Sequence, residues 1–486
     1  MAMTADGTNG LASKITVTLN GASSSSPDAG TTTYPLLISN KPYTTKSSFP
    51  VHSPATGKVL HHFSSASIED AEHAISAAQR AYPAWRALSP PKKRDILLRA
   101  AEIMDSRKEL FIKACVEETG AEPGWGEFNH GLAVDMLKDI AGRLSSIAGT
   151  IPTTSQEGVS ALVYKEPYGV ILAIAPWNAP FILGLRSIAY PLAAGNTAIL
   201  KAPELSPLCF TIIVSCFHDA GLPPGVLNLI AHQPSDAAAI TKHLIEHPLI
   251  KKINFTGSTA VGKIIAKLAG ENLKPVILEL GGKAPAIVLE DADLEYAAMK
   301  CAVGAFLHSG QICMATERII VHERIADAFE AEFKNAIRKF APQDQEPGCL
   351  VSKVGVEKNK RLLSDAVAKG GQIIYGELAS GTSTGATMGP VVVKGVKKDM
   401  DLFYTESFGP TVSLMVVKDD AEAVELANDT EYGLSAAVFT RDLGRALRIA
   451  RLVESGAVHV NGMTVHDETA LPHGGEFPPS LLFSLP

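Results

Sequence analysis

From Val170 onward, short apolar runs alternate with stretches of helical periodicity. Four or five consecutive apolar residues are enough for a strand that is buried on both faces, whereas a helix shows apolar positions three and four apart. Regular alternation of the two predicts a mostly parallel sheet covered by helices on both faces. The predicted strands before residue 281 are 170–175, 197–200, 226–230, 252–255 and 276–280, with helices at 208–220 and 260–269.

The same alternation resumes after Glu279. The predicted strands there are 286–289, 318–321, 412–417, 436–439 and 457–460. A chain of 486 residues is too long for one ordinary hydrophobic core, so two or three domains are expected. The sequence therefore predicts two parallel-sheet α/β domains with the Glu279 region at their junction.

The predicted boundaries follow these patterns and the composition of the intervening segments. Residues 1–33 are rich in Ser, Thr, Gly and Ala, which is typical of a mobile tail. A capped helix is expected after Ser67, and one long helix is expected over 92–119, closed by Gly120. We predict a first domain at 34–144 and 165–278, a second at 279–466, and a small β element for bridging or oligomerisation at 145–164 and 467–486.

Charge and cysteine usage exclude several classes of function. A net charge of −7 argues against nucleic acid or an anionic membrane as the main partner. The six cysteines form no CxxC pair and no disulfide framework, and no His–Cys cluster has zinc spacing, so no metal is predicted. Together with the lack of an apolar segment of signal-peptide type at the N-terminus, this favours a reducing compartment, the cytoplasm.

One charge-free stretch, 167–185, is long enough to suggest a membrane span. Gly169, Pro176, Asn178 and Pro180 interrupt it. These residues favour a buried strand, a turn and a helix, and we predict no membrane partner.

Two segments carry residues suited to covalent chemistry, namely Glu279-Leu280-Gly281-Gly282-Lys283 and Gly310-Gln311-Ile312-Cys313. The thiolate of Cys313 could attack a carbonyl carbon, and Glu279 could take a proton from water, so that a thioester forms and is then hydrolysed. For Cys313 the alternative is an inert buried thiol, which is the commoner fate of a free cysteine and the one expected for Cys301. For Glu279 the alternative is a hydrogen-bonded carboxylate at a strand end.

A second group of residues is suited to a dinucleotide. Gly257 and Ser258 follow a predicted strand and open a helix, where free backbone N–H groups favour a phosphate, although a plain strand-to-helix turn would look the same. The match to a P-loop fails at Ile264, which cannot ligate Mg²⁺. Lys201 and Glu204 end another strand, where an acid could accept hydrogen bonds from ribose hydroxyls. A solvated loop pair is the alternative there.

Two further positions are open to more than one interpretation. Asn178, next to Trp177, could donate its amide hydrogens to an oxyanion, or it could simply satisfy a turn. Glu406 and Phe408 precede a strand, and they could contact a ribose and pack on a flat cofactor. A turn with a buried phenylalanine is equally compatible with that segment.

In their order and spacing, six segments resemble the aldehyde dehydrogenase superfamily over about residues 35–475. They are PWN at 176–178, KAPE at 201–204, FTGS at 255–258, ELGGK at 279–283, GQIC at 310–313 and ESFGP at 406–410. The resemblance implies a Rossmann-like cofactor domain, a catalytic domain and a small strand-built bridging domain. It also implies an aldehyde substrate and oxidation to the acid.

The resemblance implies a role for each matching residue. Cys313 would be the nucleophile, Glu279 the base, and Asn178 with the backbone N–H of Cys313 the oxyanion hole. The cofactor would be held by Trp177, Lys201, Glu204, Gly257, Ser258, Gly281, Glu406 and Phe408. NAD is expected rather than NADP, because Glu204 would repel a 2′-phosphate.

Within the family the chain resembles the salicylaldehyde, vanillin and benzaldehyde dehydrogenases most, through residues 180–189 and 464–468. Arg186 could then meet a phenolic oxygen or the product carboxylate, although a lone arginine is more often a structural ion-pair partner. The resemblance further suggests a fungal enzyme that oxidises an aromatic polyketide aldehyde in secondary metabolism.

The sequence departs from the family pattern after Gly475. The resemblance implies a terminal strand that pairs across a homo-oligomer, but residues 476–486 contain Pro478 and Pro479, which cannot donate to such a pairing. We therefore expect a truncated C-terminus and a weakened dimer. Two other functions stay open: acyl transfer to coenzyme A, which needs no hydrolytic base, and an inactive protein that only binds cofactor.

Overall fold

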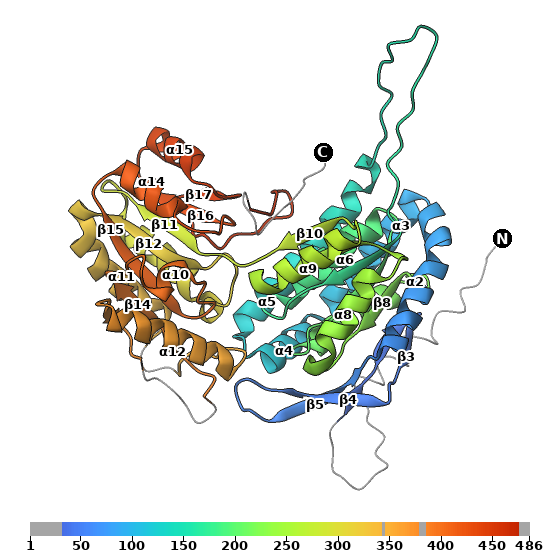
Figure 1. The fold of residues 1–486 in the computed structure, drawn as a ribbon, viewed down its shortest axis with the longest axis horizontal. Helices are drawn as coiled ribbons and strands as arrows, with labels where there is room; N and C mark the ends of the chain where they lie inside the picture. The colour runs from blue at the N-terminus through green and yellow to red at the C-terminus, as the bar shows by residue number, and fades with distance from the viewer. Residues whose placement is uncertain (1–31, 343–345, 379–384, 476–486) are drawn as a thin grey trace, which may run out of the picture.

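The computed structural model describes residues 32–342, 346–378 and 385–475. The chain forms two α/β lobes, the first drawn from blue to green and the second from yellow to red (Figure 1). The sheet of the first lobe has the order β10 (Val276–Glu279), β9 (Ile250–Thr256), β6 (Val170–Ile174), β7 (Thr197–Lys201), β8 (Leu227–Ile230), β2 (Leu36–Ile38) and β3 (Lys41–Tyr43). Its pairs are parallel except those that β2 makes with β8 and β3.

The second sheet is built in the same way. Its order is β13 (Gln372–Tyr375), β14 (Val391–Lys394), β15 (Thr411–Val417), β12 (Thr316–His322), β11 (Ala284–Val288), β16 (Ala436–Phe439) and β17 (Val458–Val460). Only the edge pair β13–β14 is antiparallel. The prediction of two mostly parallel α/β sheets is confirmed.

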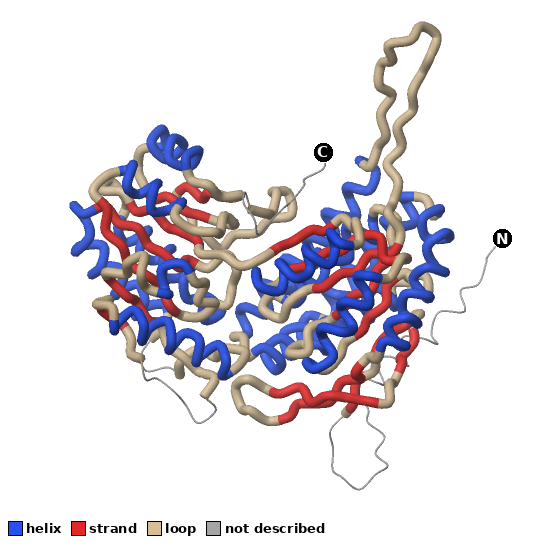
Figure 2. Tube along the Cα trace, viewed as in Figure 1, coloured by secondary structure: helices blue, strands red, loops and turns tan. Residues whose placement is uncertain are grey.

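Helices pack around both sheets (Figure 2). Those of the first lobe are α2 (Ile68–Ala87), α3 (Pro90–Ser106), α4 (Lys108–Thr119), α5 (Pro123–Arg143), α6 (Pro180–Ala193), α7 (Pro207–Asp219), α8 (Ala237–Glu246) and α9 (Thr259–Glu271). Those of the second are α10 (Leu294–Phe306), α11 (Ala326–Phe340), α12 (Lys353–Ala368), α13 (Asp401–Tyr404), α14 (Asp420–Asn428) and α15 (Leu443–Leu452). The central strands β6, β7 and β11 are buried along their whole length, as expected for strands covered on both faces.

The predicted central strands and helices are confirmed within one to three residues, but the long helix over 92–119 is wrong. Arg107 leaves helical geometry, with φ −106° and ψ 16°, and separates α3 from α4. Its guanidinium Nη2 lies 2.5 Å from Asp219 Oδ2 at the end of α7. This tertiary ion pair accompanies a break that the local pattern does not signal.

A long arm leaves the first lobe between α5 and β6 and projects at the upper right of Figure 1. We expected strands over 145–164, but the arm holds a single isolated bridge, in which Thr150 pairs antiparallel with Val163. The arm consists of two adjacent segments of the same chain, with no third strand and no covering helix. Such an arm has nothing to stabilise a longer run of strand pairing. A separate three-stranded sheet of β1 (Thr33–Tyr34), β5 (Val59–Ser65) and β4 (Ser47–His52) borders the first lobe.

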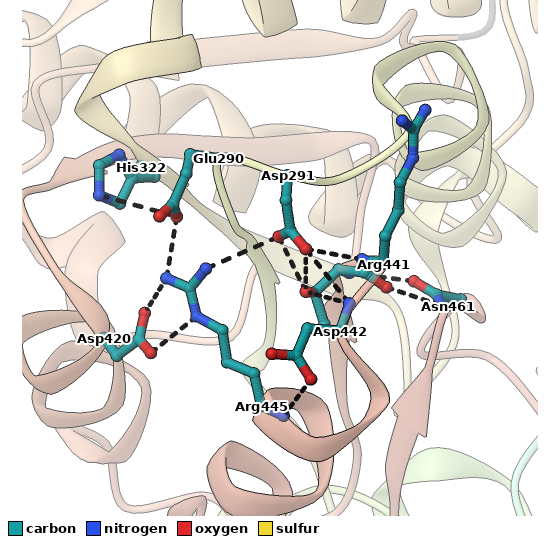
Figure 3. A network of polar contacts seen from close by, with 9 residues as sticks. Glu290, Asp291, His322, Asp420, Arg441, Asp442, Arg445 and Asn461 are labelled. Atoms are coloured by element: carbon teal, nitrogen blue, oxygen red, sulfur yellow. Dashed lines mark hydrogen bonds and ion pairs between the residues drawn. The ribbon is translucent and has the colours of Figure 1, made fainter.

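An ion-pair network at one end of the second sheet ties α14 and α15 to the end of β11 (Figure 3). The guanidinium of Arg445 contacts three carboxylates, those of Glu290, Asp291 and Asp420. Asp291 also accepts hydrogen bonds from the backbone N–H groups of Arg441 and Asp442, at 3.0 and 3.2 Å. The network fixes α14 and α15 on the second sheet, and it is not part of the junction between the two lobes.

The remaining expectations concern the membrane and the chain ends. The charge-free stretch forms β6, a turn and the start of α6, as predicted. In the three described ranges no helix combines the length and the apolar character needed to cross a membrane. Most of the predicted tail and the predicted C-terminal departure, 476–486, lie outside the described residues.

Candidate active site

The crossover between the two sheets brings three of the predicted segments together. Strand β10 ends at Glu279 and β11 begins at Ala284, so four residues join the lobes. A Cβ atom on Gly282 would lie 2.1 Å from the carbonyl oxygen of Cys313, and one on Gly281 would lie 2.6 Å from Glu406 Oε2. Glycine is required at position 282, because the neighbour there is the backbone of Cys313, whereas a side chain at position 281 would displace the carboxyl group of Glu406.

The Cys313 segment adopts an unusual backbone conformation. His308, Ser309 and Gly310 all have positive φ, at 49°, 54° and 70°. Two of the three are not glycine, which costs on the order of 1–3 kcal/mol each. Contacts hold the turn in place: His308 stacks on Trp125 at 5.1 Å, and a Cβ on Gly310 would lie 2.2 Å from the carbonyl oxygen of Gly409.

The residues around Cys313 precede β12 of the second sheet, but they pack into the core of the first lobe. Ile312, Met314 and Ala315 are buried there, and Cys313 is partly buried against the same core. Gln311 is fixed from the other side, since its Oε1 accepts a hydrogen bond of 2.8 Å from the backbone N–H of Val351. The candidate nucleophile is thus held by both lobes.

Asn178 lies beside the same segment. Its Nδ2 donates to the carbonyl oxygen of Gln311 at 2.9 Å, and its own carbonyl oxygen accepts from Trp125 Nε1 at 2.9 Å. A carboxamide nitrogen carries two N–H groups, so one remains for a ligand. Asn178, the side chain predicted to hold an oxyanion, is therefore hydrogen-bonded to Gln311, which precedes Cys313 by two positions in the sequence.

The site disfavours buried charge on both reactive groups. Burial raises the pKa of the Cys313 thiol to about 12, and the carboxyl groups of Glu279 and Glu406 raise it further. Burial also raises the pKa of Glu279 to about 8, while Arg186 opposes the shift. A carboxyl group with a pKa near working pH is suited to general base catalysis. Cys301 is buried on α10, which agrees with the inert role expected for it.

The candidate phosphate site lies at the start of α9. Ser258 caps the helix by accepting a hydrogen bond from the backbone N–H of Val261 at 3.4 Å. The backbone N–H of Gly257 donates to the carbonyl oxygen of Glu279 at 3.0 Å, so this turn is joined to the strand that carries the candidate base. The first N–H groups of the 13-residue helix have no partner within the helix, which suits an anion.

Lys201 and Glu204 lie at the end of β7, next to the end of β8. The amine of Lys201 is buried, and burial lowers its pKa, which Glu204 opposes. Nearby, the Nε2 atom of His232 is buried without a hydrogen-bond partner among the described residues. A buried amine and an unpartnered imidazole nitrogen beyond the carboxyl ends of parallel strands fit a dinucleotide better than an apolar core.

Glu406 and Phe408 approach the crossover from the second lobe. Glu406 Oε1 accepts a hydrogen bond of 2.9 Å from the backbone N–H of Gly282, and burial raises the pKa of its carboxyl group to about 7. Phe408 has a positive φ of 48° and packs edge to face against Trp177, with ring centroids 5.9 Å apart. Trp177 and Phe408, the two aromatic residues predicted from the sequence to contact the cofactor, therefore lie in contact with each other.

Two residues that hold this segment were not identified from the sequence as site residues. Lys283 Nζ lies 2.5 Å from Glu317 Oε2, and both side chains are buried. Glu317 also accepts hydrogen bonds from the backbone N–H groups of Ser407 and Phe408, at 2.7 and 3.1 Å. Lys283 lies in the ELGGK segment, but Glu317 has no local signal, because Ser407 and Phe408 are 90 and 91 positions away from it.

Arg186 projects from α6 and forms an ion pair with Asp467, while its Nη1 has no hydrogen-bond partner in the described part of the chain. Both residues line a cavity of about 900 Å³ that also contains Glu279 and His473. Apolar and aromatic side chains complete its wall, among them Ile147, Tyr168, Ile171, Tyr190, Ile277 and Leu471. Within the described ranges no cluster of three or more His, Cys, Asp or Glu residues could hold a metal ion.

Comparison with known proteins places these features in a family. The model of the aldehyde dehydrogenase family matches residues 42–476. A vanillin dehydrogenase from Pseudomonas fluorescens is 45% identical over 448 residues, which cover 91% of this chain and 92% of the relative. A benzaldehyde dehydrogenase [NAD(+)] from Pseudomonas putida is 37% identical over 432 residues, covering 87% of each chain.

A solved structure shows the same fold. The salicylaldehyde dehydrogenase from Pseudomonas putida G7, complexed with salicylaldehyde, has a TM-score of 0.88 at 38% identity and covers 91% of this chain and 93% of its own. Both NAD and NADP occur in the names of the relatives. The vanillin, benzaldehyde and salicylaldehyde dehydrogenases named here come from Pseudomonas, and the suggested fungal origin and role in secondary metabolism stay predictions.

Proposed function

This chain belongs to the aldehyde dehydrogenase family, and we propose that it oxidises an aromatic aldehyde to the carboxylic acid with NAD⁺. The observation that carries this proposal is the meeting of Cys313, Asn178 and Glu279 at the crossover between the two sheets. They come from three segments more than 30 positions apart, and glycine backbone lets the segments approach. A thiol, a free amide N–H and a base of raised pKa are the groups that thioester formation and hydrolysis require.

The proposed chemistry has two halves. Cys313 loses its thiol proton to water as Sγ forms a bond to the aldehyde carbon, and the resulting oxyanion accepts hydrogen bonds from Asn178 Nδ2 and the backbone N–H of Cys313. As the C=O bond re-forms, the hydrogen of that carbon leaves as hydride and a thioester remains. Bound NAD⁺ supplies the hydride acceptor. In the second half, Glu279 takes a proton from a water whose oxygen attacks the acyl carbon; the carbon–sulfur bond breaks and the acid leaves.

Two observations support an aromatic substrate. The relatives at 45% and 37% identity are named for vanillin and benzaldehyde, and the solved relative was crystallised with salicylaldehyde. In addition, Tyr168 and Tyr190 line the cavity that contains Glu279, and Arg186 Nη1 is buried without a hydrogen-bond partner among the residues that the structure describes. A flat ring with a phenolic oxygen would suit these groups.

A panel of aldehydes tests the proposal through NADH absorbance. We expect kcat/KM for hydroxy-substituted benzaldehydes to exceed that for linear aliphatic aldehydes by at least about tenfold, because an unpaired buried donor discriminates strongly between ligands with and without an acceptor. Preference for aliphatic aldehydes would refute the substrate class. Absence of NADH formation with every aldehyde would favour a protein that only binds cofactor.

Acyl transfer to coenzyme A is the second candidate on this fold. It needs no base for water, whereas Glu279 is buried at the crossover with a pKa raised by burial to about 8. Hydrolysis is therefore the better supported outcome. Product analysis with and without coenzyme A separates the two, since only the alternative yields an acyl thioester.

Cofactor choice gives a further expected result. The carboxylate of Glu204 would repel a 2′-phosphate, so we expect NAD⁺ to be preferred to NADP⁺. Glu204→Gln should raise kcat/KM for NADP⁺ by about tenfold, through loss of one repulsive charge, and should change the value for NAD⁺ far less. Glu271→Gln, an exposed acid at the far end of α9, is the matched control. A wild-type preference for NADP⁺ would contradict this assignment.

Location and assembly complete the proposal. All six cysteines are unpaired, which supports a reducing compartment, and we assign the protein to the cytoplasm. A homo-oligomer is supported by the arm, where Ile151, Leu162 and Tyr164 are 75%, 60% and 72% exposed. Apolar side chains exposed to that degree commonly lie in contacts between subunits.

A further inference from the structure

The indole of Trp125 contacts both sides of the proposed oxyanion site. Its Nε1 donates to the backbone carbonyl oxygen of Asn178 at 2.9 Å. Its ring stacks on the imidazole of His308, with ring centroids 5.1 Å apart and an angle of 11° between the planes. His308 lies five positions before Cys313, in the turn of positive φ that follows α10. One side chain of α5 therefore joins the residue that would hold the oxyanion to the turn that precedes the proposed nucleophile.

These contacts belong to a closed ring of interactions. Asn178 Nδ2 donates to the carbonyl oxygen of Gln311 at 2.9 Å. The backbone N–H of Gln311 donates to the carbonyl oxygen of His308 at 3.1 Å, and its Nε2 donates to the same oxygen at 3.2 Å. The indole of Trp125 closes the ring, so Asn178 is held against the Cys313 segment by two routes. One route is the direct hydrogen bond to Gln311, and the other is the path through the stacked rings.

The stack holds by packing and not by charge. His308 is 7% exposed, and burial lowers the pKa of its imidazole to about 3, so the ring is neutral at working pH. Its Nε2 has no hydrogen-bond partner among the described residues. The position thus uses the flat face of an aromatic ring, which packs well on an indole. A phenyl ring should serve there as well as an imidazole.

Further contacts keep the two rings in place. Phe128, one turn further along α5, stacks on the other ring system of this group, Trp125, with centroids 5.5 Å apart. Asn129 Nδ2 donates to the backbone carbonyl oxygen of Trp125 at 3.0 Å. Trp177 packs edge to face against His308 with centroids 6.3 Å apart. The stack is therefore enclosed by neighbours from the first lobe, while His308 itself comes from the segment between α10 and β12 of the second.

We propose that Trp125 and His308 position Asn178 against Cys313 and thereby set the geometry of the oxyanion site. The proposal rests on the oxyanion role given to Asn178 above. An oxyanion donor is effective only when its N–H points at the place where charge develops, and a displacement of about 1 Å can cost about a hundredfold in rate. Trp125 and His308 are positioning residues, because they act on the oxyanion through Asn178.

The test follows acylation without any cofactor. Cys313 Sγ attacks the carbonyl carbon of p-nitrophenyl acetate, an activated ester, and the thiol proton is lost to water. The tetrahedral oxyanion then collapses, p-nitrophenolate leaves and an acetyl thioester remains. This oxyanion needs the same donors as the one formed from an aldehyde. The value of kcat/KM for the ester, followed by p-nitrophenolate absorbance, reports on this step.

We expect Asn178→Ala to lower kcat/KM about a hundredfold, and Trp125→Phe, which keeps a ring but removes the N–H, to lower it about tenfold. His308→Ala, which removes the stacked ring, should also lower it about tenfold, whereas His308→Phe should stay within about twofold of wild type. In the Asn178→Ala background, Trp125→Phe and His308→Ala should each have less than about a twofold effect, because the amide that they position is gone.

Trp85→Phe is the matched control. Trp85 is also a buried tryptophan of the first lobe, and its Nε1 donates to the backbone carbonyl oxygen of Leu192 at 3.1 Å. That bond joins α2 to the last turn of α6, whereas Asn178 lies just before the first turn of the same helix. Trp85→Phe removes the same kind of hydrogen bond and should keep the wild-type kcat/KM.

Two results would overturn the proposal. A loss by the same factor in the presence and in the absence of the Asn178 amide would assign Trp125 and His308 a general structural role. A wild-type kcat/KM for Trp125→Phe or for His308→Ala would show that the stack does not position Asn178. The two variants lie on different elements, so either one tests the proposal if the other fails to fold.

The same measurements separate this proposal from the proposed function. If Asn178→Ala itself keeps the wild-type kcat/KM, the oxyanion role of Asn178 fails, and the positioning role fails with it. If Asn178→Ala is slow while Trp125→Phe and His308→Ala are as fast as wild type, only the positioning role fails.

Discussion

Cys313→Ala should lower aldehyde oxidation by more than about a thousandfold, because the covalent intermediate can no longer form. Cys313 lies at the crossover between the two lobes. Its segment is fixed by the hydrogen bond of Gln311 to Val351 and by the packing of Gly282 on the carbonyl oxygen of Cys313. Steady-state NADH formation is the measurement. Iodoacetamide should alkylate Cys313 in wild type, as detected by mass spectrometry. Alkylation at position 313 should be reduced when an aldehyde-derived acyl group already occupies the thiol.

Two controls separate chemistry from folding. Cys301→Ala should keep most of the activity, since that thiol is buried on α10 and its replacement removes only a small buried group. Quenching of tryptophan fluorescence by NADH should be retained in Cys313→Ala, because the cofactor residues are unchanged. Turnover by Cys313→Ala at a wild-type rate would refute covalent catalysis.

Glu279→Gln should release about one equivalent of NADH per site and then stall as the acyl-enzyme. Formation of the thioester does not consume the activated water, so only the second half of the reaction needs the base. Rapid-mixing absorbance detects the burst, and intact-mass measurement detects the trapped acyl group. A steady-state rate equal to that of wild type would remove Glu279 from deacylation.

The pH dependence distinguishes this loss from instability. The folded-state pKa of Glu279 is raised from 4.5 to about 8, so the folded protein holds this proton more tightly than the unfolded chain does. Its ionisation therefore lowers the free energy of unfolding as pH rises from 4.5 to about 8. Glu279→Gln removes that penalty and should be at least as stable as wild type at alkaline pH. Deacylation by wild type should increase around pH 8, where the carboxylate accumulates in the folded protein.

The sequence predicts those features of the fold that local patterns determine. Strands such as β6 and β7 are short apolar runs between helices, and their type follows from burial on both faces. The motifs after β7, β9 and β10 each follow a strand that the sequence predicts, and parallel strands present their carboxyl ends at one edge of the sheet. Short edge strands such as β3 and β13 carry no comparable pattern, and they were missed.

The parts that were not predicted depend on distant partners. Glu317 is important because its carboxylate accepts hydrogen bonds from the backbone N–H groups of Ser407 and Phe408, and nothing around position 317 signals these contacts. His473 comes within reach of Glu279 across nearly 200 positions, through the path of the chain after β17. Likewise, the break at Arg107 coincides with an ion pair to Asp219 and not with a helix-breaking residue.

The burial of Ile312, Met314 and Ala315 in the core of the first lobe has a consequence for biosynthesis. The ribosome delivers the first sheet before these residues emerge, and that lobe can collapse while the second is still being made. The segment with the proposed nucleophile, Cys313, would then pack into a core whose other parts already exist. Until it does so, the thiol of Cys313 and the side chain of Asn178 are not held together. The proposed active site can therefore form only after the segment that carries Cys313 has been synthesised and has packed into the first lobe.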